Sequence, residues 1–194
     1  MLDILLIVDN FIFQLINIHL NHSLFDPFYI FFHDFHKKLA FIVPLLLLWT
    51  FCIFKHKTKR MGLIFLIPLS IIITDQIGSF IKDYKLRDRP YMTLEDNKIN
   101  LLVKVSQNED ETYKKTQSSQ KSFPSNHSAN IWALSLIIGY LYANVKIYFI
   151  ILAFLISISR VYIGVHYPID VIFGALMGIM ISTLLIVLYQ KLIR

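Results

Sequence analysis

Five apolar runs separated by short polar stretches constrain the possible folds of this chain more than any other feature. The runs cover residues 39–54, 61–81, 125–142, 147–157 and 168–192. A helix needs about 20 apolar residues to cross a hydrocarbon core of about 30 Å. Backbone polar groups in lipid must be satisfied within the spanning segment, which favours helices. The runs therefore predict an all-α, polytopic membrane helical bundle with five spanning helices.

The N-terminal segment, residues 1–20, is apolar but interrupted by polar residues such as Asp9 and Asn17. This pattern favours an amphipathic helix that lies in the membrane interface. Insertion of the segment, giving six spans, is the alternative. After a turn at 21–27, a second helix is expected to begin at 28–32 and to continue through residue 38 into the first span, which residues from Phe35 onward would complete.

Composition supports a membrane protein, because 56% of the residues are hydrophobic and the mean hydropathy is +0.58. The length of 194 residues predicts a single domain, 1–194, with one long polar loop at 91–122. The net charge of +6 comes from basic residues in loops that flank the apolar runs, so we expect contact with the bilayer and no nucleic-acid partner. The single cysteine, Cys52, excludes an internal disulfide. The sequence leaves the oligomeric state open.

A cluster of chemically active residues lies between the last two apolar runs. His166 and Asp170 are four residues apart, and Pro168 between them is well placed at the first turn of a helix. The Asp170 carboxylate can then reach one imidazole nitrogen of His166 and leave the other as a nucleophile or base. Arg160 offers a planar set of donors that suits phosphate oxygens.

Two other stretches contain residues of the same kind. Lys82 and Arg89 are separated by six residues, and Ser125, Asn126 and His127 follow Pro124. Alternating helix directions put the end of the second span, the start of the third, the end of the fourth and the start of the fifth on one membrane face. The topology alone therefore brings the three stretches together.

The three motifs, K-x6-R-P, P-S-N-H and S-R-x5-H-x3-D, occur in an order that resembles the type 2 phosphatidic acid phosphatase (PAP2) superfamily of membrane lipid phosphatases. The resemblance covers residues 82–170. Asn126 departs from it, because the family most often has Gly there and uses the backbone. The resemblance implies that His166 attacks phosphorus, that Asp170 holds its far nitrogen, and that His127 protonates the leaving oxygen and then activates water.

The resemblance also implies a phosphate-binding set of Lys82, Arg89, Arg160, Ser125 and the backbone near Asn126. Because these cations do the work of a metal, no metal and no other cofactor is expected. The remaining histidines are interpreted as interfacial residues: His19, His22, His33, His36 and His56.

The small size resembles bacterial members of the superfamily that act on lipid phosphates. The favoured substrates are lipid A 1-phosphate and undecaprenyl pyrophosphate, with phosphatidylglycerophosphate or phosphatidic acid as alternatives. A soluble vanadate haloperoxidase shares the motifs but conflicts with the hydropathy. A non-enzymatic lipid transporter on the same scaffold would be favoured by loss of His127 or His166, and both are present.

The basic loop 55–60 indicates the sidedness of the chain. It carries four Lys or Arg and no acid, which is typical of a cytoplasmic loop. This loop lies at the face opposite the motifs, so we expect the site to face the periplasm from the bacterial inner membrane. The total number of basic residues on each side opposes this orientation, because twelve of the nineteen Lys and Arg lie on the motif side. Three of these twelve are assigned to phosphate binding.

Overall fold

The computed structural model describes residues 2–34, 38–84, 86–95, 98–103 and 121–193, and these form helices without any β-strand. Each helix is named here with its bounds: α1 (Leu2–Gln14), α2 (Asp26–Asp34), α3 (Leu39–Lys55), α4 (Ile67–Asp83), α5 (Pro90–Thr93), α7 (Asn126–Leu141), α8 (Lys146–Tyr162) and α9 (Pro168–Leu192). A π-helical turn at Leu15–His19 continues α1, and another at Gly62–Leu66 leads into α4.

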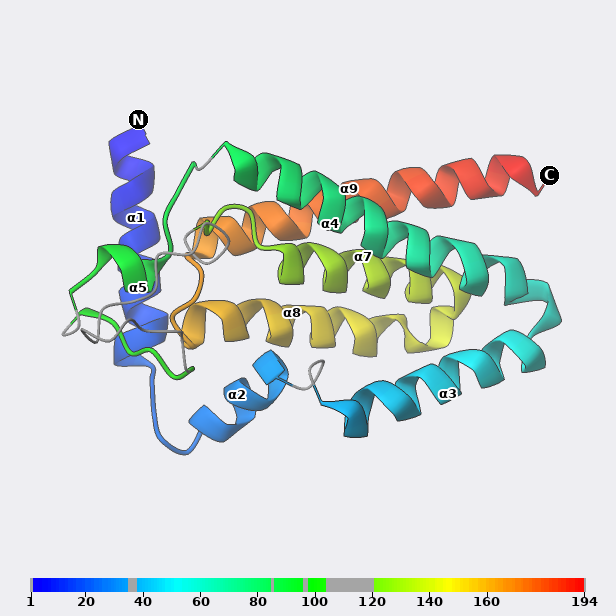
Figure 1. Ribbon diagram of the computed structural model, residues 1–194, viewed down its shortest axis with the longest axis horizontal. Coiled ribbons are helices and arrows are strands. Elements are labelled where there is room, and N and C mark those ends of the chain that lie inside the picture. The colour runs from blue at the N-terminus through cyan, green and yellow to red at the C-terminus, as the bar shows by residue number, and fades with distance from the viewer. Residues whose placement is uncertain (1, 35–37, 85, 96–97, 104–120, 194) are drawn as a thin grey trace.

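Five helices, α3, α4, α7, α8 and α9, run alongside one another, and α1 lies crosswise at one end of them (Figure 1). Three described helices are long and apolar enough to cross a membrane: Gly62–Asp83, Ala143–Tyr162 and Pro168–Leu192. α3 and α7 are shorter, at 17 and 16 residues. The prediction of an all-α membrane bundle is confirmed, and the chain is an integral membrane protein.

The prediction that one helix runs from residue 28 through residue 38 into the first span was wrong. α2 ends at Asp34, Lys38 is extended with φ −96° and ψ 122°, and α3 begins at Leu39 (Figure 1). Residues 35–37, including Phe35, lie outside the described residues. The two helices differ in direction because α2 packs on α8, where the Tyr29 ring stacks on the Tyr162 ring at 3.9 Å.

The polar residues of the N-terminal segment face the protein. Asp9 and Asn17 are buried, whereas Ile4, Ile7 and Phe11 of the same helix are about two-thirds exposed. Asn17 donates through Nδ2 to the carbonyl oxygen of Tyr162 at 2.7 Å, which satisfies one of the orphan carbonyls at the end of α8. An apolar face is thereby left for lipid, as expected of an interfacial helix.

α7 is the central helix and packs against α4, α8 and α9. Its contact with α9 is close because Gly174 and Gly178 present bare backbone. A Cβ at these positions would lie 2.4 Å from the carbonyl oxygen of Ser125 and 2.1 Å from that of Ala129. The four-residue spacing of these glycines is a pattern of small residues that permits two helices to pack closely. The contact fixes the start of α7 against the start of α9, where the motifs lie.

Candidate active site

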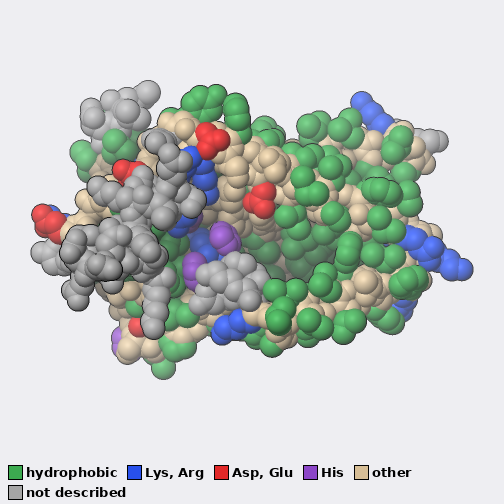
Figure 2. All heavy atoms as spheres, viewed as in Figure 1, with side chains coloured by type: hydrophobic (Ala, Val, Ile, Leu, Met, Phe, Trp, Pro, Cys, Tyr) green, Lys and Arg blue, Asp and Glu red, His purple; other side chains and the backbone are tan. Residues whose placement is uncertain are grey.

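A cavity of about 520 Å³ opens at the end of the bundle where α1 crosses it. Figure 2 shows histidine and Lys/Arg side chains gathered in this hollow, while hydrophobic side chains cover much of the same face towards the other end. The cavity is lined by His33, Ile71, Asp75, Lys82, Arg89, Asn126, His127, Asn130, Ile131, Leu134, Ile156, Arg160, Val165 and His166.

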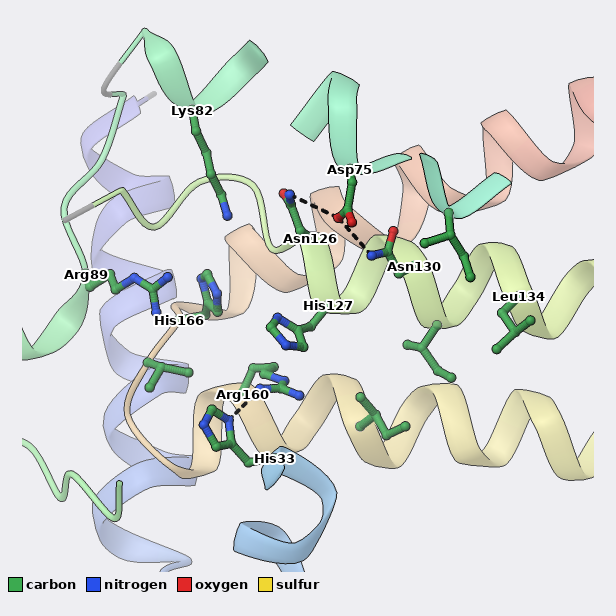
Figure 3. A pocket seen from close by; sticks show the side chains of 14 residues that line it. His33, Asp75, Lys82, Arg89, Asn126, His127, Asn130, Leu134, Arg160 and His166 are labelled. Atoms are coloured by element: carbon green, nitrogen blue, oxygen red, sulfur yellow. Dashed lines mark hydrogen bonds between the residues drawn. The ribbon is translucent and has the colours of Figure 1, made fainter. Parts of the chain in front are cut away.

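The structure brings six of the eight sequence-predicted site residues to this cavity: Lys82, Arg89, Asn126, His127, Arg160 and His166 (Figure 3). The other two, Ser125 and Asp170, are buried and are not among the residues that line it. They contact each other, since the Ser125 amide donates to the carbonyl oxygen of Asp170 at 3.0 Å. Ser125 precedes the first residue of α7, and its hydroxyl has no hydrogen-bond partner among the described residues.

Ser122 bridges His166 and Asp170, which the sequence did not predict. The distance from His166 Nδ1 to Asp170 Oδ2 is 3.7 Å, too long for the direct hydrogen bond expected from the four-residue spacing. Ser122 Oγ donates to Asp170 Oδ2 and lies 3.2 Å from His166 Nδ1. Ser122 is buried, and only its proximity to the P-S-N-H motif could have drawn attention to it.

This bridge determines the tautomer of the His166 ring. The Ser122 hydroxyl has one hydrogen, which it gives to Asp170, so it can only accept from Nδ1–H of His166. The lone pair then belongs to Nε2, and His166 lines the cavity. The arrangement leaves an unprotonated ring nitrogen, which can act as a nucleophile or as a base.

The electrostatics of the site keep His166 neutral. Burial and, after it, the positive charges of Arg89, Lys82 and Arg160 hold the pKa of its imidazole well below the usual value of 6.5. Arg89 Nε is buried and has no hydrogen-bond partner among the described residues. Such a convergence of cations, with an unused donor, is suited to an anion. Among the described residues, no cluster of three or more His, Cys, Asp or Glu could hold a metal ion.

His33 was interpreted from the sequence as an interfacial residue, and the structure contradicts this. It lines the cavity from α2, and its Nδ1 contacts Nη1 of Arg160. Its ring also lies near the His127 ring, with centroids 6.5 Å apart and planes 24° from parallel. No motif places α2 near α8, so the sequence carried no signal for this role.

Arg87, which borders the motif residues, holds the start of α9 in place. Its guanidinium pairs with Asp9 of α1, lies 3.6 Å from Asp170 Oδ1 and stacks 3.5 Å from the centre of the Tyr167 ring. Asp9 also accepts a hydrogen bond from the Ile169 amide at 2.8 Å, and so caps the N-terminus of α9. The N-terminal helix α1 is thereby connected to Asp170.

The sequence model of one protein family, the PAP2 superfamily, matches residues 61–194 of this chain. The chain belongs to the PAP2 superfamily. The resemblance predicted from the three motifs is therefore confirmed.

Individual relatives support the same assignment. Lipid A 4'-phosphatase of Bacteroides thetaiotaomicron is 26% identical over 81% of this chain and 68% of its own length. Bacitracin transport permease protein BcrC of Bacillus licheniformis is 25% identical over 63% of this chain and 54% of its own length, so the chain matches about half of that protein. The crystal structure of Aquifex aeolicus LpxE is similar in fold, with a TM-score of 0.68, 28% identity and coverage of 89% of this chain and 91% of that one.

The contacts of Arg87 generate a prediction about stability. Asp9→Asn keeps the shape of the side chain and its acceptor for the Ile169 amide, but leaves the Arg87 guanidinium with less compensation. Because breaking a buried ion pair is strongly destabilising, we expect a loss of roughly 3 kcal/mol, measured as a lower melting temperature in detergent. Glu95→Gln, which removes an exposed ion pair with Lys98, is the control and should leave the melting temperature unchanged. Equal melting temperatures for the Asp9 variant and the wild type would contradict this role.

Proposed function

We propose that this protein is a membrane lipid phosphatase that hydrolyses a lipid phosphate through a phosphohistidine intermediate. The observation that carries the proposal is one cavity lined by His166, His127 and three cationic side chains. The cations suit a phosphoryl group, and the apolar residues deeper in the cavity suit a lipid. Seven of the eight motif residues fit the superfamily pattern, with Asn126 as the exception, and this fit supports the roles assigned to them.

In the first step, Nε2 of His166 attacks phosphorus and a P–N bond forms. The bond from phosphorus to the lipid oxygen breaks, and His127 gives its proton to that oxygen. Lys82, Arg89 and Arg160 stabilise the negative charge on the phosphoryl oxygens in the transition state. Asp170, 3.7 Å from His166 Nδ1, offsets the positive charge that develops on the ring.

In the second step, His127 takes a proton from a water molecule, whose oxygen attacks phosphorus. The P–N bond breaks, inorganic phosphate leaves, and His166 returns to its neutral state. The first backbone amides of α7 are additional donors for the phosphoryl group, whereas Ser125 is buried beside Asp170 and does not line the cavity. No metal ion is needed in either step, because the three cations carry the charge that a metal would supply.

Lipid A 1-phosphate and undecaprenyl pyrophosphate are the favoured substrates, and phosphatidylglycerophosphate and phosphatidic acid are alternatives. The likeness to a lipid A 4'-phosphatase supports a lipid A phosphate, although that relative is named for the phosphate at the other position. BcrC of Bacillus licheniformis is named as a transport permease. Both histidines are present at the cavity here, which favours hydrolysis over transport alone.

We place the protein in the bacterial inner membrane with the cavity facing the periplasm. Lys55, Lys57, Lys59 and Arg60 occupy the turn between α3 and α4, at the end of the bundle opposite the cavity (Figure 1). Basic residues in short loops favour the cytoplasmic side, which supports this orientation.

The catalytic roles are tested by phosphate release in detergent with excess EDTA. The wild type is expected to release phosphate from at least one of the four lipid phosphates named above. His166→Ala should abolish turnover, because no neighbour replaces the nucleophile. His127→Ala should lower it by about 10²–10⁴-fold, the usual contribution of general acid–base catalysis. Full turnover by the His166 variant would refute the covalent mechanism, and loss of wild-type activity in EDTA would refute metal independence.

The pH profile tests the electrostatics of His166. Attack requires the neutral ring, so activity is lost as pH falls through its pKa. Because burial and then the cations hold this pKa well below 6.5, the acidic limb of kcat/KM should lie at correspondingly low pH. Arg89→Gln removes one cation, so it should raise the pKa and move the limb to higher pH with the same substrate. Lys98→Gln, an exposed cation away from the cavity, should not move it; an unmoved limb in the Arg89 variant would contradict the assignment.

The orientation is tested by labelling single cysteines, placed in a Cys52→Ala background, with an impermeant thiol reagent. The cells are intact, with a permeabilised outer membrane. Glu95→Cys lies on the cavity side and should be labelled, whereas Thr58→Cys in the basic turn should not. Labelling at 58 without labelling at 95 would place the cavity in the cytoplasm.

A further inference from the structure

The wall of the cavity changes its chemistry with depth along the helices. α7 presents Asn126, Asn130 and Leu134, which follow one another at four-residue steps and so share one face (Figure 3). Each step corresponds to a rise of about 6 Å. Figure 3 shows the same order across the cavity, with Arg89 and His166 at one end and Leu134 at the other. The level of the cavity at Asn126 and Asn130, called here the polar level, therefore separates the cationic side chains from the apolar inner end of the cavity near Leu134.

Asp75 of α4 is the charged residue of this polar level. An ionisable residue inside a spanning helix is costly, and here it faces the cavity. Its Oδ1 accepts a hydrogen bond from Asn130 Nδ2 at 2.8 Å and a longer one from Asn126 Nδ2 at 3.4 Å. Thr74 donates to Oδ1 of Asn130 and thereby fixes the orientation of that amide. The carboxyl group is held in one position by this network.

The network uses only one of the two carboxyl oxygens. Among the described residues, no hydrogen bond reaches Oδ2 of Asp75. The residue is partly exposed and lines the cavity, so this oxygen can accept a hydrogen bond from a molecule bound there. Gly78, one turn further along α4, leaves room for the Asn126 side chain, since a Cβ at this position would lie 2.3 Å from its Oδ1. The cluster thus depends on a close fit between α4 and α7.

A carboxylate repels a phosphate group, so the position of Asp75 relative to the cationic side chains indicates which part of the substrate lies beside it. In Figure 3, His127 lies between the group of Arg89 and His166 on one side and the pair of Asp75 and Asn130 on the other. His127 protonates the leaving oxygen in the proposed reaction. The part of the substrate next to the leaving oxygen therefore reaches the level of Asp75. A hydroxyl or amide N–H would be accepted there, whereas a second phosphate would be repelled.

We propose that Asp75, held by Asn130, makes the enzyme selective for lipid phosphomonoesters whose leaving alcohol carries an O–H or N–H donor beside the ester oxygen. Lipid pyrophosphates are disfavoured at the same position, so of the two favoured substrates lipid A 1-phosphate fits this site and undecaprenyl pyrophosphate does not. This inference rests on the proposed phosphatase function and names the substrate class within it. Glycerol phosphates with a free hydroxyl on the carbon next to the ester, and N-acylated amino-sugar 1-phosphates, both have this chemistry, and they are separated by the experiment below.

The test compares substrates that differ by a single hydroxyl. Phosphate release is measured in detergent with 1-acylglycerol 3-phosphate and with 3-acyloxypropyl phosphate, which lacks the hydroxyl at carbon 2. We expect the wild type to prefer the hydroxylated substrate by about tenfold in kcat/KM, as one buried hydrogen bond provides. Asp75→Asn should bring the ratio close to one, and should raise hydrolysis of farnesyl pyrophosphate relative to 3-acyloxypropyl phosphate.

Asp83→Asn is the matched control, since it makes the same chemical change at the end of the same helix, where Asp83 is exposed and pairs with Lys121. The control should keep the wild-type ratio. A purely structural role of Asp75 would lower kcat/KM for both substrates equally and leave the ratio unchanged, which would overturn the inference. If Asp75→Asn does not fold, the wild-type ratio and the partial loss of preference expected for Asn130→Ala remain as tests.

The outcomes also separate this inference from the function on which it rests. Equal wild-type rates on the two matched substrates would overturn the selectivity and leave the phosphatase function intact. Absence of phosphate release from every substrate would overturn both. An N-acylglucosamine 1-phosphate lipid is the third substrate; a higher kcat/KM than that of 1-acylglycerol 3-phosphate would assign the donor to an amide N–H, and the reverse to a hydroxyl.

Discussion

Mutual repulsion among Lys82, Arg89 and Arg160 is the constraint on which this structure depends. Three cations near one cavity at the membrane edge are unfavourable unless negative charge lies close to them. Asp170 is buried behind the cavity and Asp9 lies beyond it, with Arg87 between the two carboxylates. The charges therefore alternate from the cavity into the protein. This alternation leaves the cavity itself attractive to an anion.

The position of α9 links this charge pattern to the fold. The start of the helix carries Asp170, and its amide at Ile169 is capped by Asp9 from α1. The two glycines further along the helix bring it against the backbone of α7, which begins beside Ser125 and His127. A substitution that separated α7 from α9 would separate His127 from His166, the general acid and the nucleophile of the proposed reaction. The packing contact between α7 and α9 thus also fixes the relative positions of the two histidines.

Much of this could be predicted from the sequence, because the relevant signals are local. The apolar runs predicted the spanning helices, and Pro168 predicted the first residue of α9. The alternating direction of the spans predicted that His127 and His166 lie at one site, and both line the cavity. The role of Ser122, the contact of His33 with Arg160, and the pairing of Asp9 with Arg87 could not be predicted. Each joins residues 44 or more positions apart, and no periodicity or motif spacing encodes such a contact.

The break between α2 and α3 has the same origin. Local hydrophobicity permits one continuous helix, but the aromatic ring of Tyr29 and the imidazole of His33 gain their partners only when α2 turns towards α8. Tertiary packing then overrides the local preference for a longer helix. The result brings His33 of α2 into the cavity, and Asp9 of α1 pairs with Arg87 behind it, while apolar residues of both helices remain exposed. Both helices are therefore part of the architecture of the site, since they contact Arg160 and Arg87.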